Sequence, residues 1–533
     1  MSTIRSVQMW ITIAALSLAP LFFGSVDLLW VAIWTTLLSI GVLCGATLPM
    51  QAGQRAILIA FLALCGAYAL VAIIQVVPGA MDRLDDPIWQ RARVLLQIDV
   101  LPRISSRAEI PPAAIGHLLL TITGFTSGFF VGTSRRNSDT LTDLARYGIL
   151  AYALYGLAAL AFTPDLLLWA PKLAYRGSLT SSFVNHNTAA TFLGTGVIMW
   201  SCSALLTLQS LQLSSLRVLL LTPATERVAF ELILRLGAGL ICFFALLLSG
   251  SRGGLICTCL GLLVAVGLMT ANRLRPGFWY ALGSAVAALS VMIGWLTHVG
   301  RIGSEGMFDD GRWAVYGICL DIIRQRPLLG SGAGTFADIF PSLRPADFNS
   351  WGVWDYAHST ILEIAVEMGV PIAVLIVVAS VALLRVLARA ALVREDRARG
   401  SFAAITGIAV LSYTHSMIDF SLQIPGYLVV FGILLGCWMS RSAAEQTSAQ
   451  PASWPGLTAA AKSGFRRRMP AAALDMPSAP RAKAEPGASE AAQSDVALAT
   501  MKGQADSALS SGNVGAGRPD LIPEPGVGRG LNL

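Results

Sequence analysis

Long, nearly uninterrupted apolar runs alternate with short polar connections along the first 440 residues. A helix needs about 20 apolar residues to cross the hydrocarbon core of a bilayer, and these runs approach that length. They lack the alternation of apolar and polar positions that is typical of a membrane-spanning β-strand. Because lipid offers the backbone no hydrogen-bond partner, each run is expected to be a helix. The pattern therefore predicts an all-α polytopic membrane protein with about 12 transmembrane helices.

The predicted spans leave one long loop and one long tail. The spans cover residues 8–24, 28–49, 56–77, 113–132, 144–163, 188–208, 231–250, 254–271, 278–298, 366–384, 401–418 and 424–440. Residues 299–365 form a loop far longer than a connection needs, and long loops usually serve a function. Residues 442–533 are rich in Ala, Pro, Ser and Gly, which predicts a disordered tail. Residues 1–441 are thus predicted to form a transmembrane domain that includes the loop.

The basic residues of the short connections predict their sidedness, because loops rich in Lys and Arg stay in the cytoplasm. With the N-terminus inside, every second connection is basic, through Arg55, Arg135, Arg136, Arg146, Arg217, Arg227, Arg273, Arg275, Arg385, Arg389, Arg394, Arg397 and Arg399. Both termini are then cytoplasmic and residues 78–112, 164–187 and 299–365 face outward. For a bacterial protein this orientation corresponds to the inner (cytoplasmic) membrane, with residues 299–365 as a periplasmic loop.

Composition supports the membrane assignment and excludes a soluble enzyme. Of the 533 residues, 55% are hydrophobic and only 13% are charged, and the mean hydropathy is +0.64. A soluble domain carries about a quarter of its residues as charged side chains. Most of the eight cysteines lie in or beside apolar runs, so no disulfide framework is implied. Cys257 and Cys259 are interpreted as packing residues, and neither a metal site nor a nucleic-acid partner is predicted.

Arginine is frequent in the segments predicted to face outward, against the usual bias. Because guanidinium groups match phosphate oxygens, this excess indicates an anionic ligand. The alternative is that the arginines pair with nearby acids, namely Asp82, Asp85, Asp86, Asp309 and Asp310. In the segment LLLSGSRGGLICTCLGLL, Arg252 lies between two spans with almost no loop, beside Gly250 and Gly253, which permit a tight reversal. Arg252 is either held at the outer membrane surface or merely snorkels to the interface.

Two further segments carry candidate chemistry. In GRWAVYGICLDIIRQRPLLGSGAGTF, apolar positions at helical spacing predict a helix on the outer leaflet that ends at Pro327, followed by a glycine-rich turn. The GxGxG pattern there is weak evidence for phosphate binding, because no strand precedes it. The segment WDYAHSTILEIAVEMGVP places His358 at the entry to the tenth predicted span. A histidine can take a proton from a sugar hydroxyl near neutral pH, although a lone histidine more often has a structural role.

The ordered set of segments resembles the O-antigen ligase and polymerase family of bacterial inner-membrane glycosyltransferases. The resemblance is carried by SLTSSFVNHNTAATFL, SGSRGG, GRW followed by RPLLGSGAGTF, AHSTILEIAVEMG, and HSMIDFSLQIPG. It is strongest over residues 178–440, with an O-antigen ligase-related region at about 235–385. It implies a GT-C-like helical fold and transfer of a glycan from undecaprenyl pyrophosphate to a glycan or lipid A-core acceptor, at the outer face of the lipid bilayer and without a metal or other cofactor.

The resemblance also implies roles for particular residues. Arg252 and Arg312 correspond to arginines that hold the pyrophosphate of the donor, and His358 to the histidine that activates the acceptor hydroxyl. The chain departs from the family pattern at Ser359 and at Pro371, where Asn and Gly are usual. Two arginines can stabilise a departing pyrophosphate electrostatically, and one base then suffices for a single displacement, which would invert the anomeric carbon.

Five other residues are candidates for substrate binding: Asn185, His186, Asn187, Arg176 and Glu367. For the residues at the mouth of the sixth span the alternative is helix capping, and for Glu367 it is an ion pair with an arginine. Polymerisation of O-antigen or exopolysaccharide and protein O-glycosylation remain alternatives within the family. A transporter or flippase for the same lipid-linked glycan is an alternative of another class, which would favour ionisable groups in mid-membrane and an internal repeat.

Overall fold

The computed structural model describes residues 2–210, 223–271, 310–344, 354–394 and 398–449. Contacts divide the chain into two units, Met1–Pro451 and Ala452–Leu533, and every described element belongs to the first. The predicted ninth span at 278–298 lies outside the described residues, as does the tail from residue 450. Disorder of that tail therefore stays a prediction.

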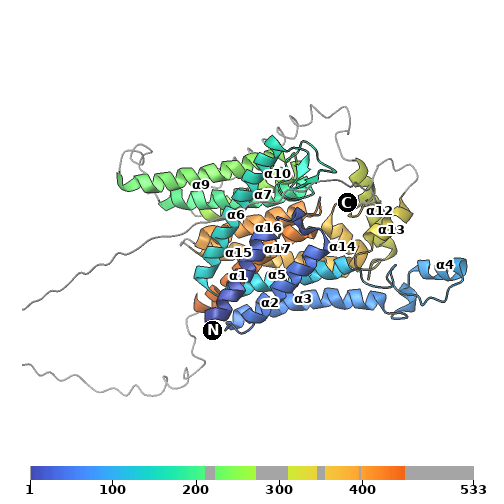
Figure 1. The fold of residues 1–533 in the computed structure, drawn as a ribbon. Coiled ribbons are helices and arrows are strands. Elements are labelled where there is room, and N and C mark those ends of the chain that lie inside the picture. The colour runs from blue at the N-terminus through green and yellow to red at the C-terminus, as the bar shows by residue number, and fades with distance from the viewer. Residues whose placement is uncertain (1, 211–222, 272–309, 345–353, 395–397, 450–533) are drawn as a thin grey trace, which may run out of the picture. The chain divides into compact units, whose positions relative to one another are not determined.

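The described fold is helical, with a minimal pair of strands (Figure 1). The α-helices are α1 (Ser2–Leu18), α2 (Leu28–Gly45), α3 (Ala52–Val76), α4 (Pro87–Leu96), α5 (Pro112–Val131), α6 (Arg135–Phe162), α7 (His186–Ser210), α9 (Pro223–Leu248), α10 (Arg252–Thr270), α12 (Asp310–Gln325), α13 (Phe336–Leu343), α14 (Thr360–Met368), α15 (Val370–Val393), α16 (Ala398–His415) and α17 (Pro425–Ala449). Short 3₁₀ turns are η1 (Phe23–Ser25), η2 (Asp82–Leu84) and η3 (Ser421–Gln423), and β1 (Leu166–Leu167) pairs antiparallel with β2 (Ala170–Pro171).

Nine helices in the described part of the chain are long and apolar enough to cross a membrane: α2, α3, α5, α6, α7, α9, α10, α15 and α17. Each matches one of the twelve predicted spans within a few residues at most boundaries. Helix α1 is apolar but shorter, over Ile4–Leu18. Helix α16 forms at the predicted eleventh span, with Arg399 and His415 near its ends, and is not among these nine. A polytopic all-α membrane protein is confirmed, and the count of twelve stays a prediction.

Two predicted boundaries are wrong. The tenth span does not begin at residue 366, because the chain breaks at Gly369, whose φ of +84° separates the short helix α14 from α15. A Cβ atom at Gly369 would overlap the Leu328 carbonyl, so this break needs glycine. At the other end of the domain, α17 continues to Ala449, past the predicted start of the tail at residue 442.

Close helix contacts in the first unit depend on glycines that face a neighbouring backbone. Helices α5 and α17 approach so closely that a Cβ atom at Gly128 would overlap the Ile433 carbonyl, and one at Gly436 would overlap the Phe125 carbonyl. Helices α10 and α16 meet in the same way at Gly261 and Gly407. Small residues at helix contacts are typical of membrane proteins, where dispersion and not water exclusion drives packing.

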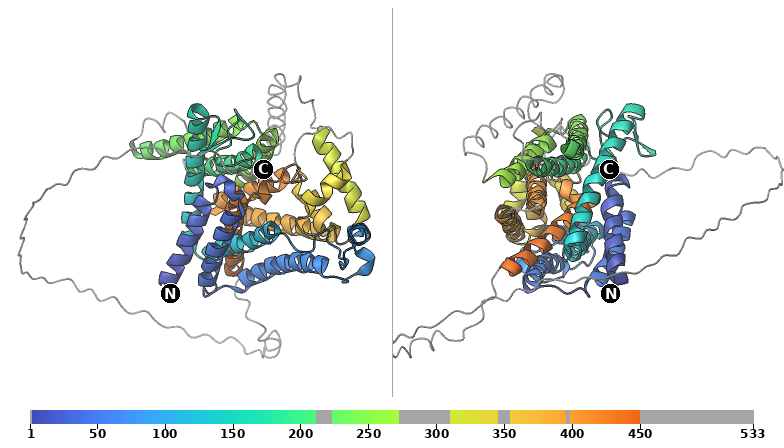
Figure 2. Two further views of the ribbon diagram at one scale, coloured as in Figure 1. Left: turned by 45° about the vertical axis from the view of Figure 1, so that its right-hand side comes forward. Right: turned by 90° about the vertical axis from the view of Figure 1, so that its left-hand side faces the viewer.

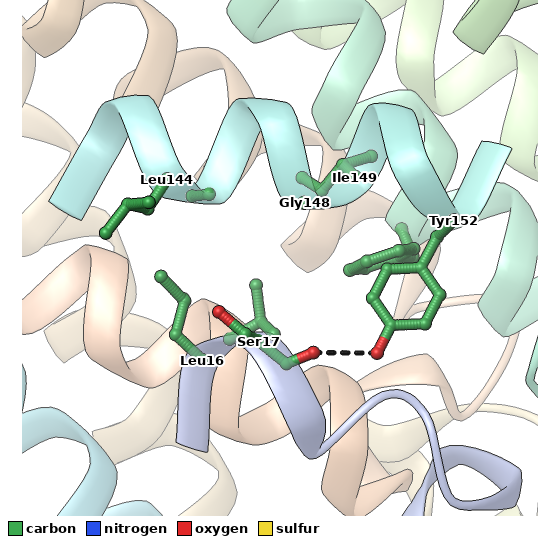
Figure 3. Close-up of a pocket in the computed structure, with 9 residues that line it drawn as sticks. Leu16, Ser17, Leu144, Gly148, Ile149 and Tyr152 are labelled. Atoms are coloured by element: carbon green, nitrogen blue, oxygen red, sulfur yellow. Dashed lines mark hydrogen bonds between the residues drawn. The ribbon is translucent and has the colours of Figure 1, made fainter. Parts of the chain in front are cut away.

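Helices α6 and α1 leave only a trace of unfilled space between them. The void has a volume of about 10 Å³ and is lined mainly by apolar residues including Leu16, Leu144 and Ile149 (Figure 3). The Tyr152 hydroxyl closes one side by donating a 2.7 Å hydrogen bond to the Ser17 carbonyl. Since a water molecule needs about 10–15 Å³, this void is a packing feature and not a ligand site.

Helices α4, α12 and α13 lie beyond one end of the long helices (Figures 1 and 2). Ion pairs connect the two segments that form this layer. Arg326 pairs with the buried Asp86, and Arg107 donates a 2.8 Å hydrogen bond to Asp338. The pair with Asp86 is one that the alternative of acidic partners allowed, whereas Asp338 was not among the acids considered. The predicted helix over Trp313–Ile323 is confirmed as α12, with Val315, Cys319 and Ile322 on its buried face.

Candidate active site

The buried carboxylate of Asp419 is the centre of a polar cluster at the end of α16. Its side chain is 1% exposed, and it follows α16 in the connection to α17. One oxygen, Oδ2, accepts a 2.7 Å hydrogen bond from Asn187 Nδ2. The same oxygen lies 3.7 Å from Arg312 Nη2 and 3.9 Å from His358 Nδ1. Residues far apart in sequence thus converge on one carboxylate.

His358 is held in an unusual conformation beside Asp419. Its φ of +52° is in the left-handed region, which a non-glycine residue adopts only when its surroundings enforce it. Its carbonyl accepts a 2.8 Å hydrogen bond from the Tyr316 hydroxyl, and its ring packs edge-on against Trp354 and Phe420. At 3.9 Å from Asp419, Nδ1 makes no hydrogen bond with the described residues, although it is buried. The imidazole of His358 therefore faces the carboxylate of Asp419 at a distance longer than a hydrogen bond.

Arg312 reaches the cluster from the first turn of α12. Its Nη1 donates a 2.9 Å hydrogen bond to the Ile418 carbonyl, next to Asp419, and its side chain is 28% exposed. Arg324, on the last turn of the same helix, instead pairs with Asp321 at 2.7 Å.

Arg252 is the first residue of α10, as the predicted tight reversal requires. Gly250 turns the chain with a φ of +73°, and the Ser251 hydroxyl caps α10 by accepting a 3.1 Å hydrogen bond from Gly254 N. A Cβ atom at Gly253 would lie 2.9 Å from Ile418 and 3.3 Å from His415. Arg252 is exposed at this helix N-terminus. The adjacent Gly253 lies against Ile418, whose carbonyl accepts the hydrogen bond from Arg312. The positive end of the α10 dipole adds to the charge of Arg252.

The three residues at the start of α7 have three different environments. Asn185 caps the helix, because its Oδ1 accepts a 2.7 Å hydrogen bond from Asn187 N, as the capping alternative predicted. Asn187 donates to Asp419, as described above. His186 Nδ1 lies 2.8 Å from the Ser249 carbonyl, and its ring stacks on Tyr175 with 4.2 Å between ring centroids.

Arg176 and Glu367 each bond to backbone groups. Arg176 is exposed, and its Nε donates a 3.1 Å hydrogen bond to the Lys172 carbonyl. Glu367 is buried, and its two oxygens accept 2.9 Å hydrogen bonds from Gly334 N and Phe336 N. These backbone donors belong to the glycine-rich turn and to the start of α13. The carboxylate of Glu367 therefore holds that turn and caps α13, and among the described residues no arginine forms the ion pair with it that the alternative predicted.

Charges and burial set the ionisation of the cluster. Burial raises the pKa of Asp419, but the neighbouring imidazoles of His358 and His415 and the guanidinium of Arg312 outweigh it and lower the pKa below the usual value. Asp419 is therefore an anion at neutral pH. Burial and then the charge of Asp419 raise the pKa of Tyr175, which places the Tyr175–His186 pair within the field of the same anion.

A cavity of about 470 Å³ adjoins the cluster. Its walls are mostly apolar side chains of α3, α5, α15 and α17, and polar groups gather where it meets α14, including Thr360, Glu363 and Gln423. Thr360 also lies in the cluster, because its Oγ1 donates a 3.3 Å hydrogen bond to the Asp419 carbonyl. The cavity and the cluster thus share one wall. Among the described residues, no three His, Cys, Asp or Glu side chains gather as metal ligands.

The sequence predicted Arg312, His358 and Asn187, which the structure brings together, but not Asp419, which joins them. A signal was present, since an acidic residue at the end of an apolar span is costly unless it has partners. His415 was missed as well. It is buried at the end of α16, where its Nδ1 lies 2.8 Å from Thr191 Oγ1 and 3.0 Å from Ser421 Oγ.

Comparison with known proteins supports the part of the chain that contains most of these residues. A family model described as O-antigen ligase matches residues 237–377. The matched range includes Arg252, Arg312, His358 and Glu367, whereas Asn187 and Asp419 lie outside it. A search of curated proteins finds no match.

Proposed function

Since residues 237–377 match a family model described as O-antigen ligase, we propose that this membrane protein transfers a glycan from undecaprenyl pyrophosphate to an acceptor hydroxyl. The observation that carries the proposal is the convergence of His358, Arg312 and Asn187 on the buried anion Asp419. A base, a cation and an orienting carboxylate are the groups that such a displacement needs. The proposed location is the bacterial inner membrane, with this cluster facing the periplasm and both termini in the cytoplasm.

His358 is the proposed general base. With Nδ1–H directed at Asp419, the lone pair of Nε2 accepts the proton of the acceptor hydroxyl as its oxygen attacks the anomeric carbon. The bond from that carbon to the pyrophosphate oxygen breaks, and undecaprenyl pyrophosphate leaves with the bonding electrons. Asp419 stabilises the imidazolium that forms, and the 3.9 Å separation closes when substrate is bound, as is common for catalytic hydrogen bonds. A single displacement inverts the anomeric configuration.

Arg312 and Arg252 are the proposed donors to the departing pyrophosphate. A guanidinium carries five N–H donors, so Arg312 can keep its hydrogen bond to Ile418 while it binds phosphate oxygens. Arg252 adds a second cation at the N-terminus of α10, where helix N–H groups and the helix dipole favour an anion. As negative charge grows on the leaving group, both interactions strengthen, which is what lowers the barrier. We propose that this pair performs the role without a metal.

The adjoining cavity suits the lipid part of a lipid-linked substrate. Its apolar walls come from membrane-spanning helices, and its polar end reaches Thr360, two residues after His358. A hydrocarbon chain in this cavity would leave its polar head near the cluster. Among the other candidates, Asn187, His186 and Arg176 are proposed to contact the glycan or pyrophosphate. Asn185 and Glu367 are proposed to support the site through the backbone hydrogen bonds that they make.

The proposal is tested with purified protein in lipid nanodiscs, lipid-linked glycan and three acceptors, namely lipid A-core, free glycan and a hydroxyl-containing peptide. His358→Ala is expected to abolish transfer, and Arg312→Ala to lower it by about 10²-fold or more. Arg324→Ala removes the same charge from the exposed end of α12 and is the matched control, which should retain activity. Transfer that survives His358→Ala would refute the base assignment. Movement of the lipid-linked glycan across the bilayer without covalent transfer would establish a transporter instead.

A further inference from the structure

Glu363 connects the two loops that carry His358 and Asp419. It lies in the first turn of α14 and is 6% exposed. Its Oε2 accepts a 2.7 Å hydrogen bond from Ala357 N, the peptide nitrogen immediately before His358. Its Oε1 accepts a 2.6 Å hydrogen bond from Gln423 Nε2, in the turn η3 that follows Asp419. One carboxylate therefore spans both halves of the candidate site.

The loop before α14 needs such support, because His358 is strained. A left-handed backbone is unfavourable for a residue with a Cβ atom. Three hydrogen bonds hold the strained turn from different sides: Tyr316 to the His358 carbonyl, Thr360 N to the Ser416 carbonyl, and Ala357 N to Glu363. Of these three bonds, the one to Glu363 has a side chain as its acceptor.

The other contacts of Gln423 extend the same network. The Gln423 carbonyl lies 2.6 Å from His117 Nε2 on α5, and its side-chain oxygen lies 3.4 Å from the Thr360 hydroxyl. Glu363 is thus joined through Gln423 to a membrane-spanning helix. This arrangement anchors the loop that carries His358 to helix α5.

A purely structural role does not account for a carboxylate at this position. A helix-capping side chain bonds its own helix, whereas Glu363 bonds Ala357, which precedes the helix, and Gln423, which lies in another segment. Burying a carboxylate is costly, and an apolar side chain of similar size is often at least as stabilising. Burial and the nearby Glu367 raise the pKa of Glu363, while the hydrogen bonds from Ala357 and Gln423 oppose that rise. Burying the Glu363 side chain is unfavourable, yet it links the segment that carries His358 to the segment that follows Asp419. This combination indicates that Glu363 serves the candidate site.

We infer that Glu363 is a positioning residue that fixes the left-handed turn at His358 and so aims its imidazole at Asp419. The inference rests on the proposed function, in which His358 is the base. Glu363 itself does not take part in proton transfer. Its contribution is to keep the Nδ1 atom of His358 facing the carboxylate, so that Nε2 meets the acceptor hydroxyl.

Glu363→Gln is the first test. The glutamine keeps the size of the side chain but offers one oxygen where two donors, Ala357 N and Gln423 Nε2, must be accepted. We expect kcat to fall by about 10- to 100-fold, because misplaced catalytic groups lose rate steeply, while KM for the lipid-linked donor stays within about threefold. Glu109→Gln makes the same substitution at an exposed glutamate that lies outside the cavity and is the matched control, with kcat expected to stay unchanged.

Two measurements separate positioning from stability. The fall in kcat of Glu363→Gln should persist at temperatures well below the melting temperature of the variant, where it is fully folded. The rate at which diethyl pyrocarbonate modifies His358, followed by mass spectrometry, should change in Glu363→Gln and not in Glu109→Gln. If Glu363→Gln does not fold, Gln423→Ala removes one donor of the same carboxylate, and it should also lower kcat with little effect on KM.

The outcomes distinguish this inference from the proposed function. Unchanged kcat and unchanged His358 modification in both Glu363→Gln and Gln423→Ala would overturn the inference, even with His358→Ala inactive. A matching fall in kcat in the two variants, absent from Glu109→Gln, would support it. Full transfer by His358→Ala would instead refute the proposed function, whatever Glu363→Gln does.

Discussion

Replacing Asp419 by Asn removes the anion that joins the candidate site while keeping its shape. In the proposed reaction, the imidazolium of His358 forms 3.9 Å from Asp419 Oδ2. Two unit charges at this distance interact by about 4 kcal/mol at an effective dielectric constant of about 20. Arg312 lies 3.7 Å from the same oxygen and offsets part of the field, and proton transfer is only partial in the transition state. About 2–4 kcal/mol of barrier lowering is therefore at stake, which corresponds to a fall in kcat of about 30- to 1,000-fold.

The assay is initial-rate transfer by Asp419→Asn protein in nanodiscs at saturating donor and acceptor. The donor KM is expected to change less than kcat, because the charge acts on the base and not on the pyrophosphate. A kcat within threefold of the unchanged protein, with normal folding, would refute the electrostatic argument.

Stability provides the control for this variant. The pKa of Asp419 is lowered in the folded protein, so its anion stabilises the fold above pH 3.8, the usual value, and that stability is lost as the pH falls below it. Asp419→Asn lacks this contribution at neutral pH. The asparagine also has one oxygen for two donors, Asn187 Nδ2 and Phe420 N. Combining it with Asn187→Asp supplies the missing acceptor, so the double variant should regain melting temperature without regaining kcat.

Two further predictions concern packing and pH. Gly436→Ala should lower the free energy of unfolding by about 1–3 kcal/mol, because the added methyl group overlaps the Phe125 carbonyl. Gly148→Ala places its methyl group in open space and should be neutral. Thermal unfolding of the two variants in detergent compares these effects. Burial raises the pKa of Glu367, so the folded protein retains that proton to a higher pH than the unfolded chain, and thermal stability should decline as the pH rises above 4.5. Glu367→Gln should flatten this decline, and an equal slope in both proteins would contradict the assignment.

Much of the helical architecture follows from the sequence, because long apolar runs in lipid have few structural options. The predicted spans locate nine helices that can cross a membrane within the described residues. The predicted tenth span runs through Gly369, although Gly369 followed by Pro371 is a pattern that ends one helix and begins another. The close approach of the Leu328 carbonyl, a tertiary contact that the sequence does not show, explains why this position needs glycine.

For the candidate site too, the sequence points to some residues but does not show what each of them does. Arg252 and Arg312 stand out in the sequence because charges at membrane boundaries need a reason, and His358 stands out by resemblance to a family. Asn185 and Glu367 attract the same attention, yet each engages backbone N–H groups. A side chain that caps a helix and one that contacts a ligand look alike in sequence, because both are polar groups at the end of an apolar run.

Asp419 and Glu363 show what the structure adds to this picture. Neither is the base or a phosphate ligand in the proposed mechanism, yet both act on His358: Asp419 through its charge and Glu363 through the backbone. The two are further connected, because Gln423, bound to Glu363, lies four residues after Asp419. A mobile histidine beside a lipid-linked substrate would present its Nε2 atom to the acceptor hydroxyl only part of the time. In the proposed mechanism, Asp419 beyond the end of α16 and Glu363 in the first turn of α14 hold His358 as a fixed base, and this fixation would explain why a single imidazole suffices.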